Sequence, residues 1–238
     1  MSNSGNILFF SEIHLSDIAE VGGKNSSLGE MYNILNPVGI NIPNGFAITA
    51  NAYRQFIKEN DLELPLIEML DLLDTQEYSN LSYEKEKSRA LILSGKIPET
   101  VQKDVKQAYQ ELCNKSGKSN LDVAVRSSAT AEDLPTASFA GRMESFLNIS
   151  TESQLLEAVL RCYSSLYTDR AIKYRHDMGF KELDIALSIG VQQMVRSDLA
   201  SSGVAFTIDP DSGFQNVIII NGCFGLGENI VQGRVSPD

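Results

Sequence analysis

Lys24 of this chain stands in a setting that suits the binding of phosphate. It follows Gly22 and Gly23 at a point where apolar residues begin to recur at helical spacing, so a helix is predicted to start close to it. Glycines permit a tight turn there, and the N–H groups and dipole of a helix start attract anions. An exposed lysine after a flexible turn explains these residues equally well, so the pattern by itself leaves both interpretations open.

Arg126 opens a polar segment that reaches Gly141. A strand predicted over 121–125 leads into Arg126, whose guanidinium can form paired hydrogen bonds with phosphate oxygens. Five hydroxyl side chains and several small residues follow it, which leaves backbone N–H groups accessible to a ligand. An ordinary solvated loop has a similar composition, so composition again leaves two interpretations open.

Two other glycine patterns do not meet the requirements of the sites they resemble. Residues 117–119, Gly-Lys-Ser, end like a phosphate-binding P-loop, but Leu112 occupies the position of its first glycine. Residues 225–227, Gly-Leu-Gly, follow a predicted strand, as in a dinucleotide-binding fold, but Ile230 occupies the position of the third glycine. Neither pattern is therefore interpreted as a nucleotide motif of its own.

The composition of the chain limits which partners it can bind and where in the cell we expect it. The chain has 238 residues and a formal net charge of −11, whereas a broad nucleic-acid surface needs a basic face. No stretch is apolar enough to cross a bilayer, and the N-terminus lacks the features of a signal peptide. His14, His176 and the three cysteines have no neighbours at metal-ligand or catalytic spacing. We expect a cytoplasmic protein with no metal site of its own, no nucleic-acid partner and no membrane partner.

The predicted elements mix strands and helices. Helices are expected from close to Lys24, from Thr49 to about Glu59, over most of 62–115 and around 155–163. Short strands are expected over 7–10, 46–48, 121–125, 143–149, 186–195, 203–208 and 217–220, the last of a fully buried type. Because these elements do not follow a strict βαβ period, we predict an α+β fold with two lobes. The stretch at about 62–117 is interpreted as a helical insertion or lid.

Several segments together resemble the nucleotide-binding domain of the phosphoenolpyruvate synthase / pyruvate phosphate dikinase family. They occur in the family's order and cover nearly the whole chain apart from the helical stretch around 62–115. The form of the segment Arg-Ser-Ser-Ala-Thr-Ala-Glu-Asp at 126–133 is closer to the phosphoenolpyruvate synthase branch than to the dikinase branch. The matching segments are 21–31, 43–49, 125–141, 203–210, 225–228 and 231–238.

The resemblance implies an ATP-grasp fold with ATP held between two lobes. The first lobe would span 1–185 and include the helical insertion, and 186–238 would form the hinge and the start of an incomplete second lobe. Lys24 and Arg126 would hold phosphates, as the catalytic pair. Gly141 and Ser145 would lie on the loop that covers the phosphates, Gln192, Gln193, Met194 and Val195 would form the hinge against adenine, and Glu228 would face the ribose or metal side.

The resemblance also implies parts that this sequence does not contain. The family's enzyme uses ATP to phosphorylate a histidine on a mobile domain, and a further domain binds the acceptor, most often pyruvate. Neither His14 nor His176 lies in the motif of that histidine, and most ligands of Mg²⁺ would lie beyond residue 238. We therefore expect a fragment that is inactive by itself. The alternatives are the same domain of a rifampicin phosphotransferase-like enzyme, or a non-catalytic nucleotide-binding module.

Overall fold

The computed structural model describes residues 5–130, 144–180 and 184–235. The chain divides into two compact units, Met1–Met194 and Val195–Asp238. The sequence analysis placed a division between residues 185 and 186 instead. The strand that follows residue 185 pairs with two strands of the first unit, and these pairings are the reason that the division falls after Met194.

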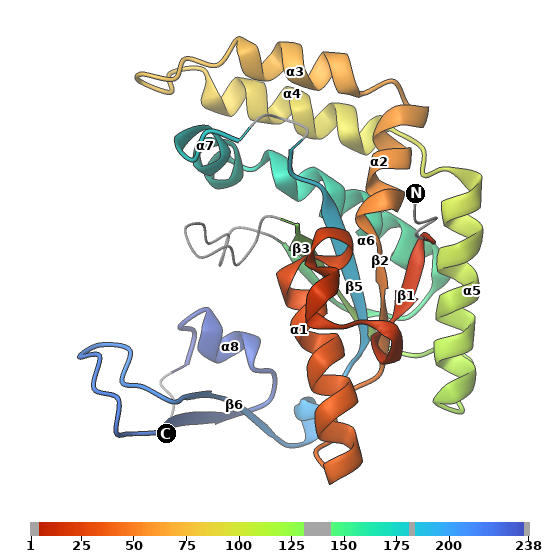
Figure 1. Cartoon of the computed structure of the whole chain (residues 1–238), viewed down its shortest axis with the longest axis vertical. Coiled ribbons are helices and arrows are strands. Elements are labelled where there is room, and N and C mark those ends of the chain that lie inside the picture. The colour runs from red at the N-terminus through yellow and green to blue at the C-terminus, as the bar shows by residue number, and fades with distance from the viewer. Residues whose placement is uncertain (1–4, 131–143, 181–183, 236–238) are drawn as a thin grey trace. The chain divides into compact units, whose positions relative to one another are not determined.

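A five-stranded antiparallel sheet forms the centre of the first unit. Its strands follow the order β1-β2-β5-β3-β4, so the strand that comes last in the sequence lies in the middle of the sheet (Figure 1). Sheet and helices together confirm the predicted α+β class. The strand bounds are β1 Ile7–Phe9, β2 Gly45–Ile48, β3 Val123–Ala129, β4 Ser145–Ile149 and β5 Leu187–Gln193.

Helices cover the two faces of this sheet unequally. Helices α2 (Ala50–Glu59), α5 (Glu99–Lys115) and α6 (Glu152–Ser164) share the large core with alternate side chains of the central strands. Helix α1 (Ile18–Leu35) packs on the opposite face, where a small cluster of Phe10, Ile13, Val21 and Ala47 is buried. The face under α1 therefore has fewer apolar side chains and more room for polar ones.

The stretch at 62–117 is helical, as predicted, and it contributes directly to the main core. It contains helices α3 (Glu63–Asp71), α4 (Leu81–Ser94) and α5. Leu66, Ile92 and Leu112 are fully buried in the same cluster as the strands of the sheet. The sequence could show that the segment is helical, but not that its apolar side chains complete the core.

Helix α7 (Asp169–Asp177) and four short 3-10 turns complete the regular structure described in the first unit, and a fifth 3-10 turn lies in the second unit. Thr168 caps α7 by accepting a hydrogen bond from the N–H of Ala171, at 3.3 Å. No helix among the described residues combines the length and the apolar content needed to cross a membrane. The 3-10 turns span Phe10–Glu12, Leu15–Asp17, Asn36–Val38, Ser165–Tyr167 and Ser197–Leu199.

The second unit contains the antiparallel pair β6 (Ser201–Phe206) and β7 (Ile219–Phe224), followed by the short helix α8 (Glu228–Val231). The prediction of a buried strand over 217–220 is wrong. Ile218 and Ile220 are 66% and 71% exposed, because the two strands and the short helix described in this unit are too few to bury both faces of the sheet.

The turn between α3 and α4 is organised around one carboxylate. Asp74 Oδ2 accepts a hydrogen bond from Ser79 Oγ at 2.6 Å, and its Oδ1 accepts from the N–H of Glu77 and of Gln76. The Ser79 hydroxyl and these backbone donors favour the charged form, so the pKa of Asp74 falls from 3.8 to about 2. Asn80 closes the turn by accepting from the N–H of Asp74 at 2.8 Å.

We expect Asp74→Asn to lower the melting temperature at pH 7 and to have little effect near pH 2. Because the pKa of Asp74 is lower in the folded chain, the stabilisation is complete above its ordinary value of 3.8 and is lost as the pH falls through about 2. Thermal unfolding monitored by circular dichroism at several pH values measures this difference. Asp71→Asn is the control, since Asp71 ends α3 next to the same turn; equal losses for the two variants would contradict the prediction.

Candidate functional site

The face of the sheet under α1 carries the polar side chains that the sequence analysis singled out. Val123, Val125, Ile189 and Val191 point into the main core, so the alternate residues of β3 and β5 face α1. The register places these residues in rows, which are Ser128 with Ser188, Arg126 with Gly190, and Ala124 with Gln192. Arg126 therefore lies on an inner strand of the sheet, directly opposite Gly190, which has no side chain.

Helix α1 breaks at Gly22, and the break brings it close to β3. Gly22 has a φ of 73° and a ψ of 167°, a conformation that glycine adopts at little cost. A Cβ at this position would lie 2.6 Å from the backbone oxygen of Ser128. Gly22, the first of the two glycines before Lys24, is thus needed for a close approach of helix and strand. The predicted helix start near Lys24 corresponds to this break.

Asn25 fastens the helix to the sheet just after the break. Its side chain is buried, and its Nδ2 donates to Ser188 Oγ at 3.0 Å, which in turn donates to the backbone oxygen of Ile48 at 2.8 Å. The N–H of Asn25 donates to Ser128 Oγ at 3.4 Å. Gly190 lies directly against the Asn25 carboxamide, and a Cβ there would overlap Asn25 Oδ1.

A cavity of about 290 Å³ opens between α1 and this face of the sheet. It brings together Lys24, Arg126 and Gln192, three of the residues that the sequence analysis named, from three separate segments. Gln192 is held by its Nε2, which donates to the backbone oxygen of Pro43 at 3.1 Å. The lining consists of Lys24, Asn25, Ser27, Leu28, Met31, Arg126, Ser127, Gly190 and Gln192.

The charge of this lining is opposite to that of the chain. The whole sequence carries a formal net charge of −11, yet the described residues that line the cavity include two cations and no carboxylate. Two cations that converge on one cavity produce a local positive potential that attracts an anion. The apolar side chains of Leu28 and Met31 form another part of the wall. The cavity can therefore hold a ligand with an anionic part and an apolar or aromatic part.

The remaining predicted residues are placed as follows. Ser145 is the first residue of β4 and pairs with Arg126, so the two side chains lie on the same face of the sheet. The N–H groups of Gln193 and Met194 donate to the backbone oxygens of Asn44 and Asp122, each at 2.9 Å. Val195 and Glu228 belong to the second unit, where Val195 is exposed and Glu228 begins α8. Gly141 lies outside the described residues.

Sequence reasoning missed Asn25, Ser27, Leu28, Met31, Ser127 and Gly190 as members of the lining. Part of the signal was present, because Lys24, Leu28 and Met31 are spaced as neighbours on one face of a helix. Gly190 gave no local signal, since its importance depends on a helix that lies far away in the sequence.

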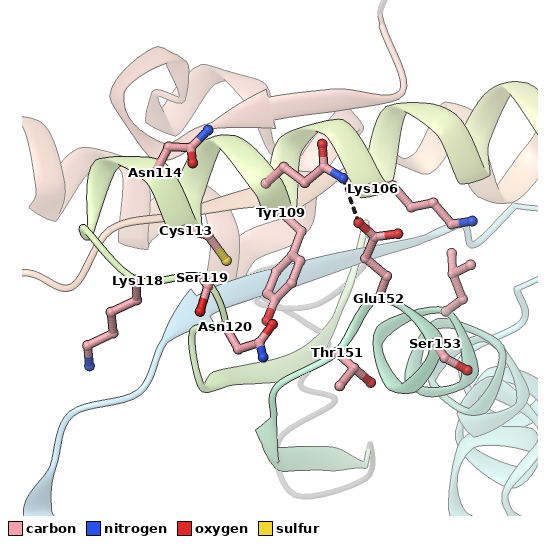
Figure 2. A pocket seen from close by; sticks show the side chains of 12 residues that line it. Lys106, Tyr109, Cys113, Asn114, Lys118, Ser119, Asn120, Thr151, Glu152 and Ser153 are labelled. Carbon is pink, nitrogen blue, oxygen red and sulfur yellow. Dashed lines mark hydrogen bonds between the residues drawn. The ribbon is translucent and has the colours of Figure 1, made fainter.

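A larger hollow of about 650 Å³ lies between the C-terminal half of α5 and the first turn of α6 (Figure 2). Lys106 and Lys118 lie toward its opposite ends in this view, with the Glu152 carboxylate between them. Glu152 accepts a hydrogen bond from Gln110 Nε2 at 2.7 Å. Burial raises the pKa of Tyr109 to about 12, and its hydroxyl donates to the backbone oxygen of Leu121. Because this hollow combines both charges and its central groups bond to the protein, the cavity under α1 is the better candidate.

The described residues contain no cluster of side chains that could bind a metal ion. No group of three or more His, Cys, Asp or Glu residues in them is placed so that it could hold a metal ion.

Comparison with known proteins identifies the family. The sequence model of the family described as "Pyruvate phosphate dikinase, AMP/ATP-binding domain" matches residues 18–238, which include α1 and all strands of the sheet except β1. The chain belongs to this family. Its members are defined by an AMP/ATP-binding domain, so the cavity under α1 lies in a domain of a nucleotide-binding type.

Curated relatives of this AMP/ATP-binding domain extend well beyond it. The chain is 51% identical over 236 residues to a phosphoenolpyruvate synthase from Synechocystis sp. (strain ATCC 27184 / PCC 6803 / Kazusa), covering 98% of the chain and 29% of that protein. It is 44% identical over 241 residues to the phosphoenolpyruvate synthase of Escherichia coli (strain K12), covering all of the chain and 30% of that protein. The chain thus spans less than a third of the length of these relatives.

We expect Gly22→Ala to destabilise this AMP/ATP-binding domain by about 2–4 kcal/mol, because left-handed strain adds to overlap with the Ser128 backbone. Chemical denaturation measures the loss. Gly39→Ala is the matched control, since Gly39 also has a positive φ, of 88°, but no neighbouring atom within 4 Å among the described residues. It should cost only about 1–2 kcal/mol. Equal losses would show that the close approach of α1 to β3 contributes nothing.

Proposed function

We propose that the cavity under α1 binds the polyphosphate of ATP. The observation that carries this proposal is the convergence of Lys24 and Arg126 on one cavity whose described lining contains no carboxylate. Arg126 offers two parallel N–H donors to phosphate oxygens, and Lys24 adds a point charge beside a break in helix α1. Membership in the AMP/ATP-binding domain family supports ATP as the ligand rather than another anion.

The other predicted roles are part of the same proposal. Ser145 shares the Arg126 face and is proposed to contact the phosphates together with Gly141. Gln192, Gln193, Met194 and Val195 are proposed to contact adenine, and Glu228 the ribose or metal side. The roles of Gly141, Gln193, Met194, Val195 and Glu228 rest on the family resemblance alone. The proposed fold type is ATP-grasp, which the antiparallel sheets of the two units support.

Mg²⁺ is proposed to accompany ATP. The described lining contains no carboxylate, and Mg²⁺ prefers carboxylates and phosphates. The ion would therefore be held by phosphate oxygens, by water and by groups other than these lining residues. Its chemistry would be the neutralisation of the polyphosphate charge.

For a longer protein that contains this domain, we propose phosphoryl transfer from ATP to a histidine on a mobile domain, and from there to pyruvate. The relatives named above are phosphoenolpyruvate synthases, which favours pyruvate over an antibiotic as the final acceptor. Phosphoryl transfer depends mainly on positioning and charge neutralisation, and these are the contributions of Lys24 and Arg126. His14 and His176 do not line the cavity, so the chain alone is proposed to bind ATP without transferring phosphate.

We expect Arg126→Ala to weaken the binding of Mg-ATP by about ten- to a hundredfold, because it removes a charge-assisted donor pair. Isothermal titration calorimetry measures the dissociation constant. Arg126→Lys should recover only part of the loss, since a lysine cannot form the paired hydrogen bonds.

Arg54→Ala serves as the matched control for Arg126→Ala. Arg54 is an exposed arginine of α2, the helix that packs on the other face of the sheet. Its loss should leave the affinity for Mg-ATP unchanged. Equal affinities for the wild type and Arg126→Ala would contradict the role of Arg126, and failure of the wild type to bind Mg-ATP would contradict the proposed function.

A further inference from the structure

A chain of hydrogen bonds runs from helix α1 through the sheet beneath the proposed phosphate site. Asn25 Nδ2 donates to Ser188 Oγ at 3.0 Å, and Ser188 Oγ donates to the backbone oxygen of Ile48 at 2.8 Å. Asn25 and Ser188 are 2% and 0% exposed. Removing one partner of a hydrogen bond that is buried to this extent destabilises the folded chain, because water cannot reach the remaining group to replace the missing partner.

This chain of bonds lies next to Lys24 in the sequence. Gly22, two residues before Lys24, packs on the backbone of Ser128, and Asn25, one residue after it, bonds to Ser188 and Ser128. The backbone of Lys24 is therefore fixed on both sides to strands β3 and β5. These strands also carry Arg126 and Gln192, so the same contacts fix Lys24 relative to both residues.

Ser188 can be used to separate positioning from direct contact with a ligand. Asn25 lines the cavity, whereas Ser188 does not, so a ligand in the cavity has no direct contact with Ser188. The Asn25 amide, which donates to Ser188 Oγ and lines the cavity, links the Ser188 hydroxyl to a ligand in the cavity.

We propose that Ser188 is a positioning residue. Through its hydrogen bond with Asn25, it holds Lys24 in the position from which the ammonium group reaches a phosphate bound beside Arg126. This inference rests on the proposed function, since it assigns a role in ATP binding to a residue outside the cavity. Without the Ser188 hydroxyl, the buried Asn25 amide has no acceptor at this position. The first turn after the Gly22 break then shifts, and the Lys24 charge moves away from the polyphosphate.

A double-mutant cycle on the full 238-residue chain tests this mechanism. Ser188→Ala should weaken Mg-ATP binding by about tenfold in the wild-type background. Lys24→Gln removes the charge but keeps a long side chain, and it should also weaken binding by about tenfold or more. If Ser188 acts through Lys24, adding Ser188→Ala to Lys24→Gln should change the dissociation constant by less than about twofold.

Asn33→Ala is the matched control for a general loosening of α1. Asn33 lies on the same helix, and its Nδ2 donates to the backbone oxygens of Phe10 and Ile13, but it does not line the cavity. Its effect on Mg-ATP binding should be small and the same with or without Lys24. Melting temperatures show whether each variant is folded. Should Ser188→Ala fail to fold, Ser188→Cys keeps the test valid, because it replaces the hydroxyl by a thiol that is only a weak hydrogen-bond partner, at a position that does not line the cavity.

The outcomes separate this inference from the proposed function. Absence of Mg-ATP binding by the wild type would overturn the proposed function and the inference with it. Binding by the wild type, together with equal losses from Ser188→Ala in the wild-type and Lys24→Gln backgrounds, would overturn the inference alone. Non-additive losses for Ser188→Ala, with additive losses for Asn33→Ala, would support it.

Discussion

The contact between helix α1 and strands β3 and β5 decides where the groups around the cavity lie. Two absent side chains make this contact possible, because a Cβ at Gly22 would meet the Ser128 backbone and a Cβ at Gly190 would meet the Asn25 carboxamide. Hydrogen bonds from Asn25 to Ser128 and Ser188 then hold the helix where the glycines admit it. Steric room and polar bonding are both required, since neither alone defines a single position for the helix.

The two faces of the sheet have different roles: one packs in the main core, and the other carries polar side chains beneath α1. On one face, a large cluster of buried apolar side chains from α2, α5 and α6 provides most of the hydrophobic burial, which is the main source of folding stability. On the other face, the apolar cluster is small, and serines, a glycine, an arginine and a glutamine stand beneath α1. A strand that is anchored by one face can present polar groups on the other without losing its position. This division explains how a protein with a net charge of −11 maintains a local cationic site.

Local patterns in the sequence predicted many of the elements and marked Lys24 and Arg126 as candidate cations for phosphate, but they left a surface or loop interpretation open for both. The helix near Lys24 and the helix after Thr49 follow from residue spacing, and the structure contains both. The strand predicted over 121–125 is displaced, because β3 spans Val123–Ala129 and includes Arg126, which was expected to open a loop. The central position of β5 and the role of Gly190 depend on partners far away in the sequence, and no local pattern encodes them. The burial of Leu66, Ile92 and Leu112 in the main core was missed for the same reason. The run at 217–220 was misjudged because an apolar composition does not reveal whether a second layer covers the strand.

The order of strands in the sheet also has a consequence for the assembly of the chain. β1 pairs with β2 and β3 pairs with β4, but only β5 connects these two pairs. During synthesis, the β1–β2 pair and the β3–β4 pair can form separately, while the sheet cannot close until residues 187–193 have left the ribosome. Such late, long-range pairing slows folding, because a large loop must be closed before its contacts form. The cavity under α1 therefore comes into existence only at this final step, since Gly190 and Gln192 arrive with the strand that connects the two pairs.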